Sequence, residues 1–220
     1  MSRKVGRPSE KTDSREKLIA AAQKLFMVLP YDKVSIRMIA EKADVNMAMI
    51  RYYFGNKEGL FETMIREIVA PIKAEMERST GDDGRDGLGE VMRTYYQTMI
   101  KTPQLPRLIV QIMNMAPSDM QRKLVERVFS DVTSPVEKLL SEKLVNNGAI
   151  RDGMDPHCCR VTFMSLMVFP FLAPPAMFKL HGIELNEAFL DKLLEHNIKV
   201  LSHGFQNPEQ FAPSGENNEN

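Results

Sequence analysis

Between Ser35 and Lys57 the chain reads SIRMIAEKADVNMAMIRYYFGNK, two short amphipathic segments separated by the four residues ADVN. Apolar residues recur at helical spacing in both segments: Ile36, Ile39 and Ala40 in the first, and Val45, Ile50 and Phe54 in the second. Helices this short become stable by packing their apolar faces against each other across a tight turn. The segment therefore predicts a helix-turn-helix, the motif that places its second helix in the major groove of DNA.

The polar residues around the predicted turn are of the types that this motif needs. Ser35 precedes the first helix and Asn46 precedes the second, and the side-chain oxygens of both residue types accept hydrogen bonds from free N–H groups at helix N-termini. Asp44 occupies the tight turn, where a left-handed backbone is expected and where Asp is tolerated better than most residues. We therefore expect both helices to be capped by their own neighbours.

A third helix is predicted upstream, from about Ser14 to the helix-breaking Pro30. Its apolar stripe consists of Leu18, Ala22, Leu25, Phe26 and Leu29. Packed over the other two helices, it leaves the segment from Asn46 to Tyr53 facing outward. The side chains that we expect on this outer face are Met47, Ala48, Met49, Arg51 and Tyr52.

The stretches REKLIAAAQKLF and SIRMIAEKADVNMAMIRYYFGNKEGLF resemble the N-terminal domain of the TetR family of bacterial repressors, over residues 14–65. The resemblance implies a three-helix DNA-binding domain, a variable helical domain for ligand binding and dimerisation, and no catalytic activity. The expected fold class is all-α: a three-helix N-terminal domain with a helix-turn-helix, followed by a larger helical ligand-binding and dimerisation domain. The C-terminal two-thirds of the chain is not matched by motif.

The resemblance also implies roles for single residues. It gives phosphate contacts to Ser35, Tyr53 and Lys57, a base or phosphate contact to Arg37, and contacts with base edges to Met47, Ala48 and Arg51. A guanidinium group binds guanine through two parallel hydrogen bonds, so Arg51 predicts a critical G in the operator. Met47 and Met49 offer only apolar contacts, for instance with a thymine methyl group. The alternatives are that Tyr53 belongs to the core and that Arg51 is a solvated surface charge.

Charge is distributed unevenly along the chain. Residues 1–66 contain 13 Lys and Arg against 8 Asp and Glu, whereas the remaining residues contain 16 against 21. A basic N-terminal lobe matches a phosphate-binding surface, and an acidic body discourages the rest of the protein from lying on DNA. The first residues, MSRKVGRPSEK, predict a flexible basic arm. Arg7 is its best candidate for a minor-groove contact, and an ordinary chain terminus is the alternative.

We expect four parts along the chain. These are a flexible basic arm over residues 1–13, the helix-turn-helix DNA-binding domain over 14–57, a helical effector-binding and dimerisation domain over 58–206, and a disordered acidic tail over 207–220. No apolar run approaches the length of a membrane span, and the N-terminus lacks a secretory signal. The two cysteines, Cys158 and Cys159, are adjacent and cannot form an ordinary disulfide. These features predict a cytoplasmic protein.

The 16 methionines, many of them between Met92 and Met177, predict an adaptable apolar pocket for a small, largely hydrophobic effector. The predicted lining consists of Met92, Tyr96, Met99, Met113, Phe163 and Met167. Three cations in the same region are candidates for an anionic head group on the effector: Arg93, Lys101 and Arg107. The alternative is that the methionine stripe is ordinary helical core.

A homodimer is expected through the last two long helices, because they carry more apolar surface than one protomer's core needs. The predicted interface residues are Met164, Val168, Phe171, Phe189, Leu193, Val200 and Leu201. Two helices from each subunit would form a four-helix bundle, and its two-fold axis would set two recognition helices roughly 34 to 36 Å apart on a pseudo-palindromic operator. Intramolecular core is equally consistent with the periodicity, so this prediction depends on the resemblance.

Metal, cofactor and catalytic sites are not expected. His157, Cys158 and Cys159 point in different directions at a helix start, and His196 and His203 lie too far apart on their helix to hold one ion. The stretch TGDDGRDGLG does not fit a calcium-binding loop, because the third ligand position of the loop is Gly84 and its position twelve is Arg93. The sequence contains no nucleophile–base motif and no phosphate-binding glycine loop. The TetR resemblance implies that the chain is a repressor released from DNA by its effector. The alternative is a helical small-molecule carrier or enzyme that does not bind DNA.

Overall fold

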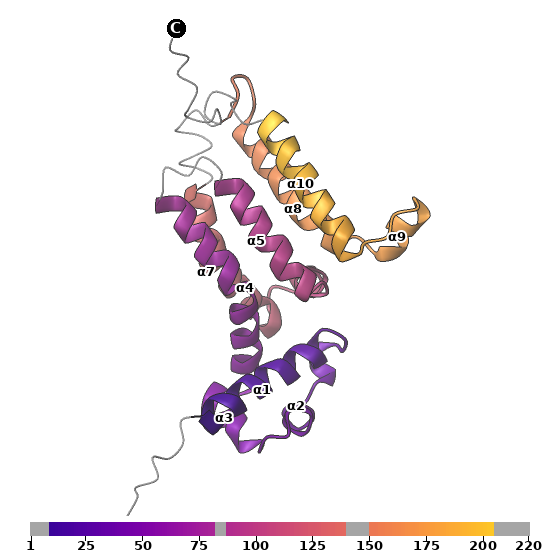
Figure 1. Cartoon of the computed structure of the whole chain (residues 1–220). Coiled ribbons are helices and arrows are strands. Elements are labelled where there is room, and N and C mark those ends of the chain that lie inside the picture. The colour runs from indigo at the N-terminus through magenta and orange to yellow at the C-terminus, as the bar shows by residue number, and fades with distance from the viewer. Residues whose placement is uncertain (1–8, 82–86, 140–149, 205–220) are drawn as a thin grey trace, which may run out of the picture. The chain divides into compact units, whose positions relative to one another are not determined.

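The computed structural model describes residues 9–81, 87–139 and 150–204, and every regular element within them is a helix (Figure 1). The predicted all-α fold class is confirmed. The N-terminal elements are α1 (Ser9–Phe26), the 3-10 helix η1 (Tyr31–Lys33), α2 (Ile36–Ala43), α3 (Ala48–Phe54) and α4 (Lys57–Gly81). The later helices are α5 (Gly87–Lys101), α6 (Leu105–Met113), α7 (Met120–Leu139), α8 (Pro156–Leu172), α9 (Pro175–Leu180) and α10 (Glu187–Gly204).

The chain divides into two compact units. Of the described residues, unit 1 comprises 9–69 and 108–129, and unit 2 comprises 70–81, 87–107, 130–139 and 150–204. Helices α4, α6 and α7 therefore each contribute residues to both units. The domain boundary predicted after Lys57 falls inside unit 1. In the second turn of α4, the ring of Phe61 packs against those of Phe26 in α1 and Tyr31 in η1.

Unit 1 is built around the three predicted N-terminal helices. Its buried core includes Leu18, Ala22 and Phe26 of α1, Ile39 and Ala40 of α2, and Ile50 of α3. Burying one such Leu, Ile or Phe side chain contributes about 1.5 to 3 kcal/mol. Ile36, predicted to lie on the buried stripe, is instead 37% exposed. The first helix starts at Ser9 and not at about Ser14, so residues 9–13 belong to a helix and not to the predicted arm.

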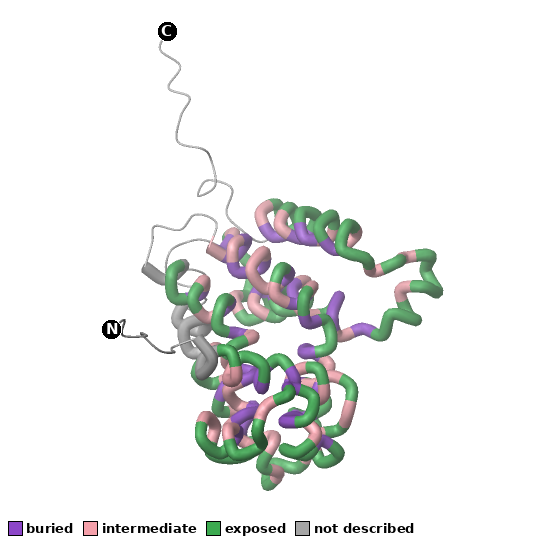
Figure 2. Tube along the Cα trace, turned by 60° about the horizontal axis from the view of Figure 1, so that its bottom comes forward, coloured by how far each residue is buried: buried purple, intermediate pink, exposed green. Residues whose placement is uncertain are grey.

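In unit 2, helices α5, α8 and α10 pack against one another. Figure 2 shows that buried residues gather along one side of these helices while the opposite sides are exposed. On α10 the buried side is formed by Leu190, Leu194, Asn197 and Leu201. On α8 it is formed by Cys159, Phe163, Met167, Pro170 and Phe171. No helix among the described residues has the length and apolar character that a membrane crossing would require.

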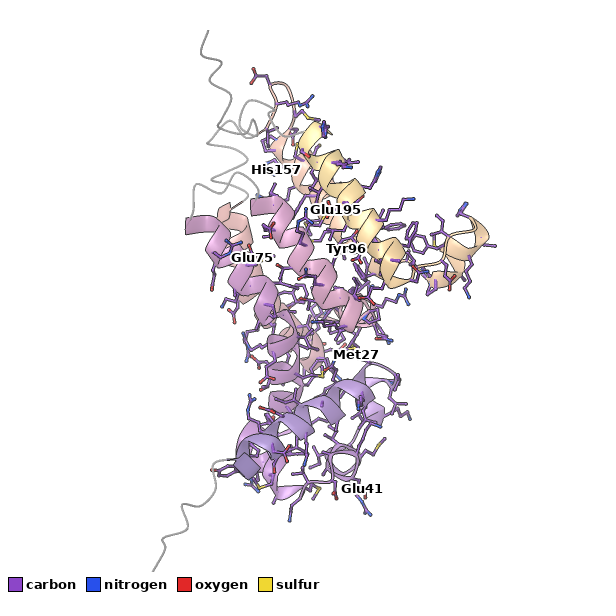
Figure 3. All side chains as sticks on the ribbon, in the orientation of Figure 1. Met27, Glu41, Glu75, Tyr96, His157 and Glu195 are labelled. Atoms are coloured by element: carbon purple, nitrogen blue, oxygen red, sulfur yellow. The ribbon has the colours of Figure 1, made fainter. Side chains whose placement is uncertain are left out.

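A buried polar cluster joins these three helices. Pro170 has no N–H group, so within α8 it cannot donate to the carbonyl of Leu166 four residues earlier. That carbonyl accepts a hydrogen bond from the Tyr96 hydroxyl of α5 at 3.0 Å and another from Asn197 Nδ2 of α10 at 3.0 Å. Asn197 Nδ2 also donates to Tyr96 Oη at 3.0 Å (Figure 3 labels Tyr96). The proline thus creates an acceptor that two side chains from other helices satisfy.

The short helix α9 was not predicted from the sequence. It lies between α8 and α10 and begins at Pro175, the last residue of the Ala-Pro-Pro run that follows α8, and its Leu180 is 85% exposed. The end of α8 is held by Arg107, which donates to the carbonyls of Leu172 at 3.2 Å and Ala173 at 2.6 Å. These carbonyls belong to the last residue of α8 and to the C-cap residue after it, so they have no intrahelical donor of their own.

Candidate DNA-binding surface

The predicted turn chemistry is present in the structure. Ser35 Oγ accepts a hydrogen bond from the backbone N–H of Met38 at 3.1 Å, which caps α2. Asp44 ends α2 in the left-handed conformation, with φ 52° and ψ 46°. Asn46 Oδ1 accepts a hydrogen bond from the N–H of Ala48 at 2.8 Å, which caps the first turn of α3. The geometry between α2 and α3 is therefore determined by residues within the motif itself.

The outer face of α3 carries exposed apolar and cationic side chains. Met47 is 48% exposed and Tyr52 is 66% exposed, whereas Ile50 between them is only 1% exposed. Ala48 and Arg51 are also exposed, and Met49 is half-buried. Exposed methionine and tyrosine side chains lose the benefit of burial unless a partner covers them. Five residues predicted to face outward therefore lie on one short helix or at its start, with Met49 less accessible than expected.

Tyr53 and Phe54 lie at the far end of α3. Both are half-buried, so Phe54 is less buried than the predicted core position. The Tyr53 ring centroid lies 4.9 Å from that of Tyr52 and 5.9 Å from that of Phe54. The guanidinium carbon of Arg15 lies 5.7 Å from the centre of the Phe54 ring. Tyr53 therefore packs against its neighbours on α3 while part of its side chain stays accessible.

A shallow hollow of about 500 Å³ opens beside the turn, lined by Arg37, Ala40, Glu41, Asp44, Val45, Asn46 and Met47. Arg37 and Glu41 are both exposed, and Arg37 Nε donates to Glu41 Oε1 at 2.7 Å. Glu41, labelled in Figure 3, was not singled out in the sequence. Its spacing of four residues from Arg37 on a helix was the available signal. Before Arg37 can bind a phosphate or a base, it has to leave this carboxylate.

Lys57 begins α4, directly after the turn that ends α3. Its ammonium donates to the backbone carbonyl of Tyr31 at 2.7 Å and lies 3.9 Å from the centre of the Tyr31 ring. The side chain is half-buried, and this burial lowers the pKa of Lys57 although Asp32 and Glu58 oppose the shift. The predicted phosphate-binding lysine is therefore engaged within its own domain. This contact was invisible to sequence reasoning because Tyr31 is 26 residues away.

Glycines join α3 to α4. Gly55 ends α3 with φ +78°, a conformation that L side chains rarely adopt, and Asn56 Oδ1 accepts from the N–H of Gly59 at 2.8 Å. A Cβ atom on Gly59 would lie 2.1 Å from the backbone oxygen of Phe54. The last carbonyl of the recognition helix is thus in direct contact with the first turn of α4.

The predicted effector-pocket residues are mostly core. Met92, Tyr96, Met99, Phe163 and Met167 are buried in unit 2. Met113 lies in unit 1 and is 37% exposed, so the structure does not group it with the others. Two of the three candidate anion-binding cations are engaged: Arg93 pairs with Glu195 of α10, and Arg107 holds the end of α8. Lys101 is exposed.

The predicted dimer residues fall into two groups. Met164 and Val200 are exposed, and Val168, Phe189 and Leu193 are half-buried. Phe171 and Leu201 are 3% and 1% exposed, so both lie in the core of their own protomer and not on its accessible surface. Phe171 packs its ring against those of Tyr95 and Tyr96. Arg7 and the predicted acidic tail, residues 207–220, lie outside the described residues.

Comparison with known proteins gives three kinds of likeness. Residues 18–64 match the family model described as bacterial regulatory proteins, tetR family. The chain is 25% identical over 207 residues to the Probable HTH-type transcriptional regulator YttP of Bacillus subtilis (strain 168), covering 86% of this chain and 92% of that one.

Two solved structures share the fold. Native NalD, the secondary repressor of the MexAB-OprM multidrug efflux pump in Pseudomonas aeruginosa, matches with TM-score 0.65 and 17% identity, over 90% of this chain and 99% of NalD. The transcriptional regulator FadR from Bacillus subtilis, in complex with stearoyl-CoA, matches with TM-score 0.62 and 18% identity, over 84% of this chain and 96% of FadR. At sequence identities this low, the likeness shows that the fold is shared and nothing further.

Proposed function

The chain belongs to the TetR family of bacterial transcriptional regulators, and on this premise we propose that it is a repressor that a small, largely hydrophobic effector releases from a pseudo-palindromic operator. The observation that carries the proposal is the outer face of α3. There Met47 and Tyr52 are exposed while Ile50 anchors the helix in the core. Recognition in the major groove requires a helix whose inner face packs on the domain core and whose outer face presents side chains to the base edges.

We propose contacts with DNA from the exposed residues of this surface. Arg51 is assigned to guanine through two hydrogen bonds, and Met47, Ala48, Met49 and Tyr52 to the neighbouring base edges. Ser35, Arg37 and Tyr53 are assigned to the phosphates that set the register, with Arg7 as a minor-groove contact. A salt-dependent affinity is expected from the arginines among these residues, because the binding of a cation to a phosphate releases counterions.

A homodimer is part of the proposal. Its support is the exposed apolar side chains of Val161 and Met164 on α8 and Val200 on α10, which are 63%, 51% and 39% exposed. Pairing these two helices with those of a second copy forms a four-helix bundle and covers these side chains. The two-fold axis then presents two copies of α3 to the two halves of an operator.

The effector is proposed to bind in unit 2, among the predominantly apolar side chains of α5 and α8. Met92, Met99, Phe163 and Met167 supply adaptable apolar surface there. With Arg93 and Arg107 engaged in intramolecular contacts, the binding site offers little to a highly charged effector. FadR, which shares the fold, was solved with stearoyl-CoA, and the apolar stearoyl chain of that ligand is the kind of group that we propose for this site.

The test begins with DNA, because no operator has to be known in advance. The purified chain is used to enrich duplexes from a randomised pool, and the affinity of the enriched duplex is measured at about 50 to 300 mM salt, where phosphate contacts predict a steep linear fall of log K with log salt. Binding without sequence preference, or the absence of binding, contradicts the proposal. Ligands that co-purify with the protein are identified by mass spectrometry and added back. A ligand that binds without weakening DNA affinity contradicts the effector part alone.

A further inference from the structure

We infer that Lys57 is a positioning residue of the DNA-binding domain: its ammonium group fixes η1 against the first turn of α4, and thereby the placement of recognition helix α3, and does not bind a DNA phosphate. The inference rests on the proposed DNA binding. It gives Lys57 a different role from the one implied by the family resemblance, and the reason lies in the contacts within unit 1.

The first step is the environment of the ammonium group. Lys57 Nζ donates to the Tyr31 carbonyl at 2.7 Å and lies 3.9 Å from the centre of the Tyr31 ring. A cation over an aromatic face is attracted by the ring quadrupole, and the attraction grows as water is removed. The half-buried side chain satisfies this condition. A phosphate that drew the ammonium away from Tyr31 would break a charge-assisted hydrogen bond and a cation–π contact together.

The second step is the anchoring of Tyr31. Its ring is stacked on that of Phe26 in α1, with centroids 5.3 Å apart and an interplanar angle of 14°. It meets the ring of Phe61 in α4 edge to face at 5.1 Å. Phe26 and Phe61 are 2% and 0% exposed, and their rings contact each other at 4.8 Å. Lys57 is therefore attached to a rigid aromatic cluster and not to a loose loop.

The third step connects Lys57 to the recognition helix. Only Gly55 and Asn56 separate Lys57 from Phe54, the last residue of α3. Two residues after Lys57, the Cα of Gly59 packs so closely on the Phe54 oxygen that a Cβ atom would lie 2.1 Å from it. With this contact, α3 cannot shift independently of the first turn of α4. A lysine that fixes this turn to η1 also fixes the angle at which α3 enters the groove.

The test distinguishes the loss of a phosphate contact from the loss of the contact that positions α3. Lys57→Met keeps the apolar stem and removes the ammonium, and Lys24→Met, on an exposed lysine of α1, removes an equal charge as a matched control. Affinities are measured for the enriched duplex across a range of salt. A lost phosphate contact would lower the slope of log K against log salt by about 0.9 per subunit. We expect instead an unchanged slope, an affinity about tenfold lower at every salt concentration, and a lower melting temperature.

A double-mutant cycle identifies the partner through which Lys57 acts. Tyr31→Leu removes the ring, and the affinity losses of Lys57→Met and Tyr31→Leu are expected to be strongly non-additive, because both remove one contact. Lys57→Gln keeps an N–H donor without charge and is expected to recover part of the affinity that Lys57→Met loses. If Lys57→Met does not fold, the salt slope is measured on Lys57→Gln.

The opposite results overturn the inference. Four results together would mean that Lys57 binds phosphate. The slope of log K against log salt would be lower by about 0.9 per subunit, and the melting temperature would be unchanged. The affinity losses would be additive, and the Met and Gln variants would bind DNA equally weakly. Failure of the proposed function is a separate outcome, in which the wild-type chain enriches no duplex. In that case the same cycle, read by thermal denaturation alone, still determines whether Lys57 and Tyr31 stabilise each other, and additivity there also overturns the inference.

Discussion

Recognition helix α3 and helix α8 both depend on hydrogen bonds made by side chains, but these come from different distances along the chain. The first turn of α3 is capped by Asn46, two residues from the N–H that it accepts. The Leu166 carbonyl of α8, left without a donor by Pro170, is satisfied by Tyr96 and Asn197, which are 70 and 31 residues away. The side-chain hydrogen bond to α3 thus comes from a neighbour in sequence, whereas those to α8 come from other helices of unit 2.

This difference matches what each helix has to do in the proposed function. Local caps leave the outer face of α3 exposed to DNA, because no other helix is needed over it. The polar cluster of α8 requires α5 and α10 to lie in one register, so a change in one of these helices is transmitted to the others. Substitutions in the two regions therefore have different consequences.

The largest effect is expected from Gly59→Ala in the local junction. The added Cβ would lie 2.1 Å from the Phe54 oxygen, a backbone atom that cannot move aside without displacing α3 or α4. We expect destabilisation of unit 1 by about 3 kcal/mol or more, together with loss of operator binding. Gly204→Ala is the matched control, since a Cβ there meets no described atom within 4 Å. Thermal denaturation and DNA-binding assays make the comparison, and wild-type behaviour of Gly59→Ala would contradict the close junction.

The next effect tests the long-range cluster. Asn197→Ala removes one of the two donors to the Leu166 carbonyl and the partner of Tyr96 Oη, all in the interior of unit 2. We expect a loss of about 2 kcal/mol in the free energy of unfolding, measured by urea denaturation. In a Pro170→Ala background the loss should be smaller, because the N–H of residue 170 can then bond to Leu166 within α8. Equal losses in both backgrounds would mean that the proline does not create the need for Asn197.

The difference between local and long-range contacts also determines which features could be predicted from the sequence. Ser35, Asp44 and Asn46 were identified from the sequence because their partners lie within a few residues. Periodicity marked Phe171 and Leu201 as apolar helix positions, but it could not determine whether a neighbouring helix or a second copy covers them. The partners of Lys57, Arg93 and Asn197 lie 26 to 102 residues away, and no local pattern indicates them.

A smaller effect, on specificity and not on folding, is expected at the exposed face of α3. Arg51→Ala should leave the melting temperature unchanged, because the side chain is exposed. It should relax the preference at one base pair in each half of the operator by about tenfold, the lower part of the range for a bidentate arginine–guanine pair. Competition between duplexes that differ only at that pair measures the preference. An equal loss of affinity for all sequences would identify Arg51 as a phosphate contact.

The smallest effect tests whether α8 also has a local device of the kind found at α3. Asp155 caps α8 by accepting hydrogen bonds from the N–H groups of Cys158 at 2.9 Å and His157 at 2.8 Å, and the bond from Cys158 is the main reason why the pKa of Asp155 is lowered. A carboxylate with a lowered pKa stabilises the folded state above its unfolded pKa, and this contribution is lost as the pH falls through the folded value. Asp155→Asn also caps a helix but does not titrate in this range. The melting temperature of the wild type should therefore fall more steeply than that of Asp155→Asn below about pH 4, and parallel curves would show that the charge of Asp155 adds nothing to the stability that a neutral cap at α8 provides.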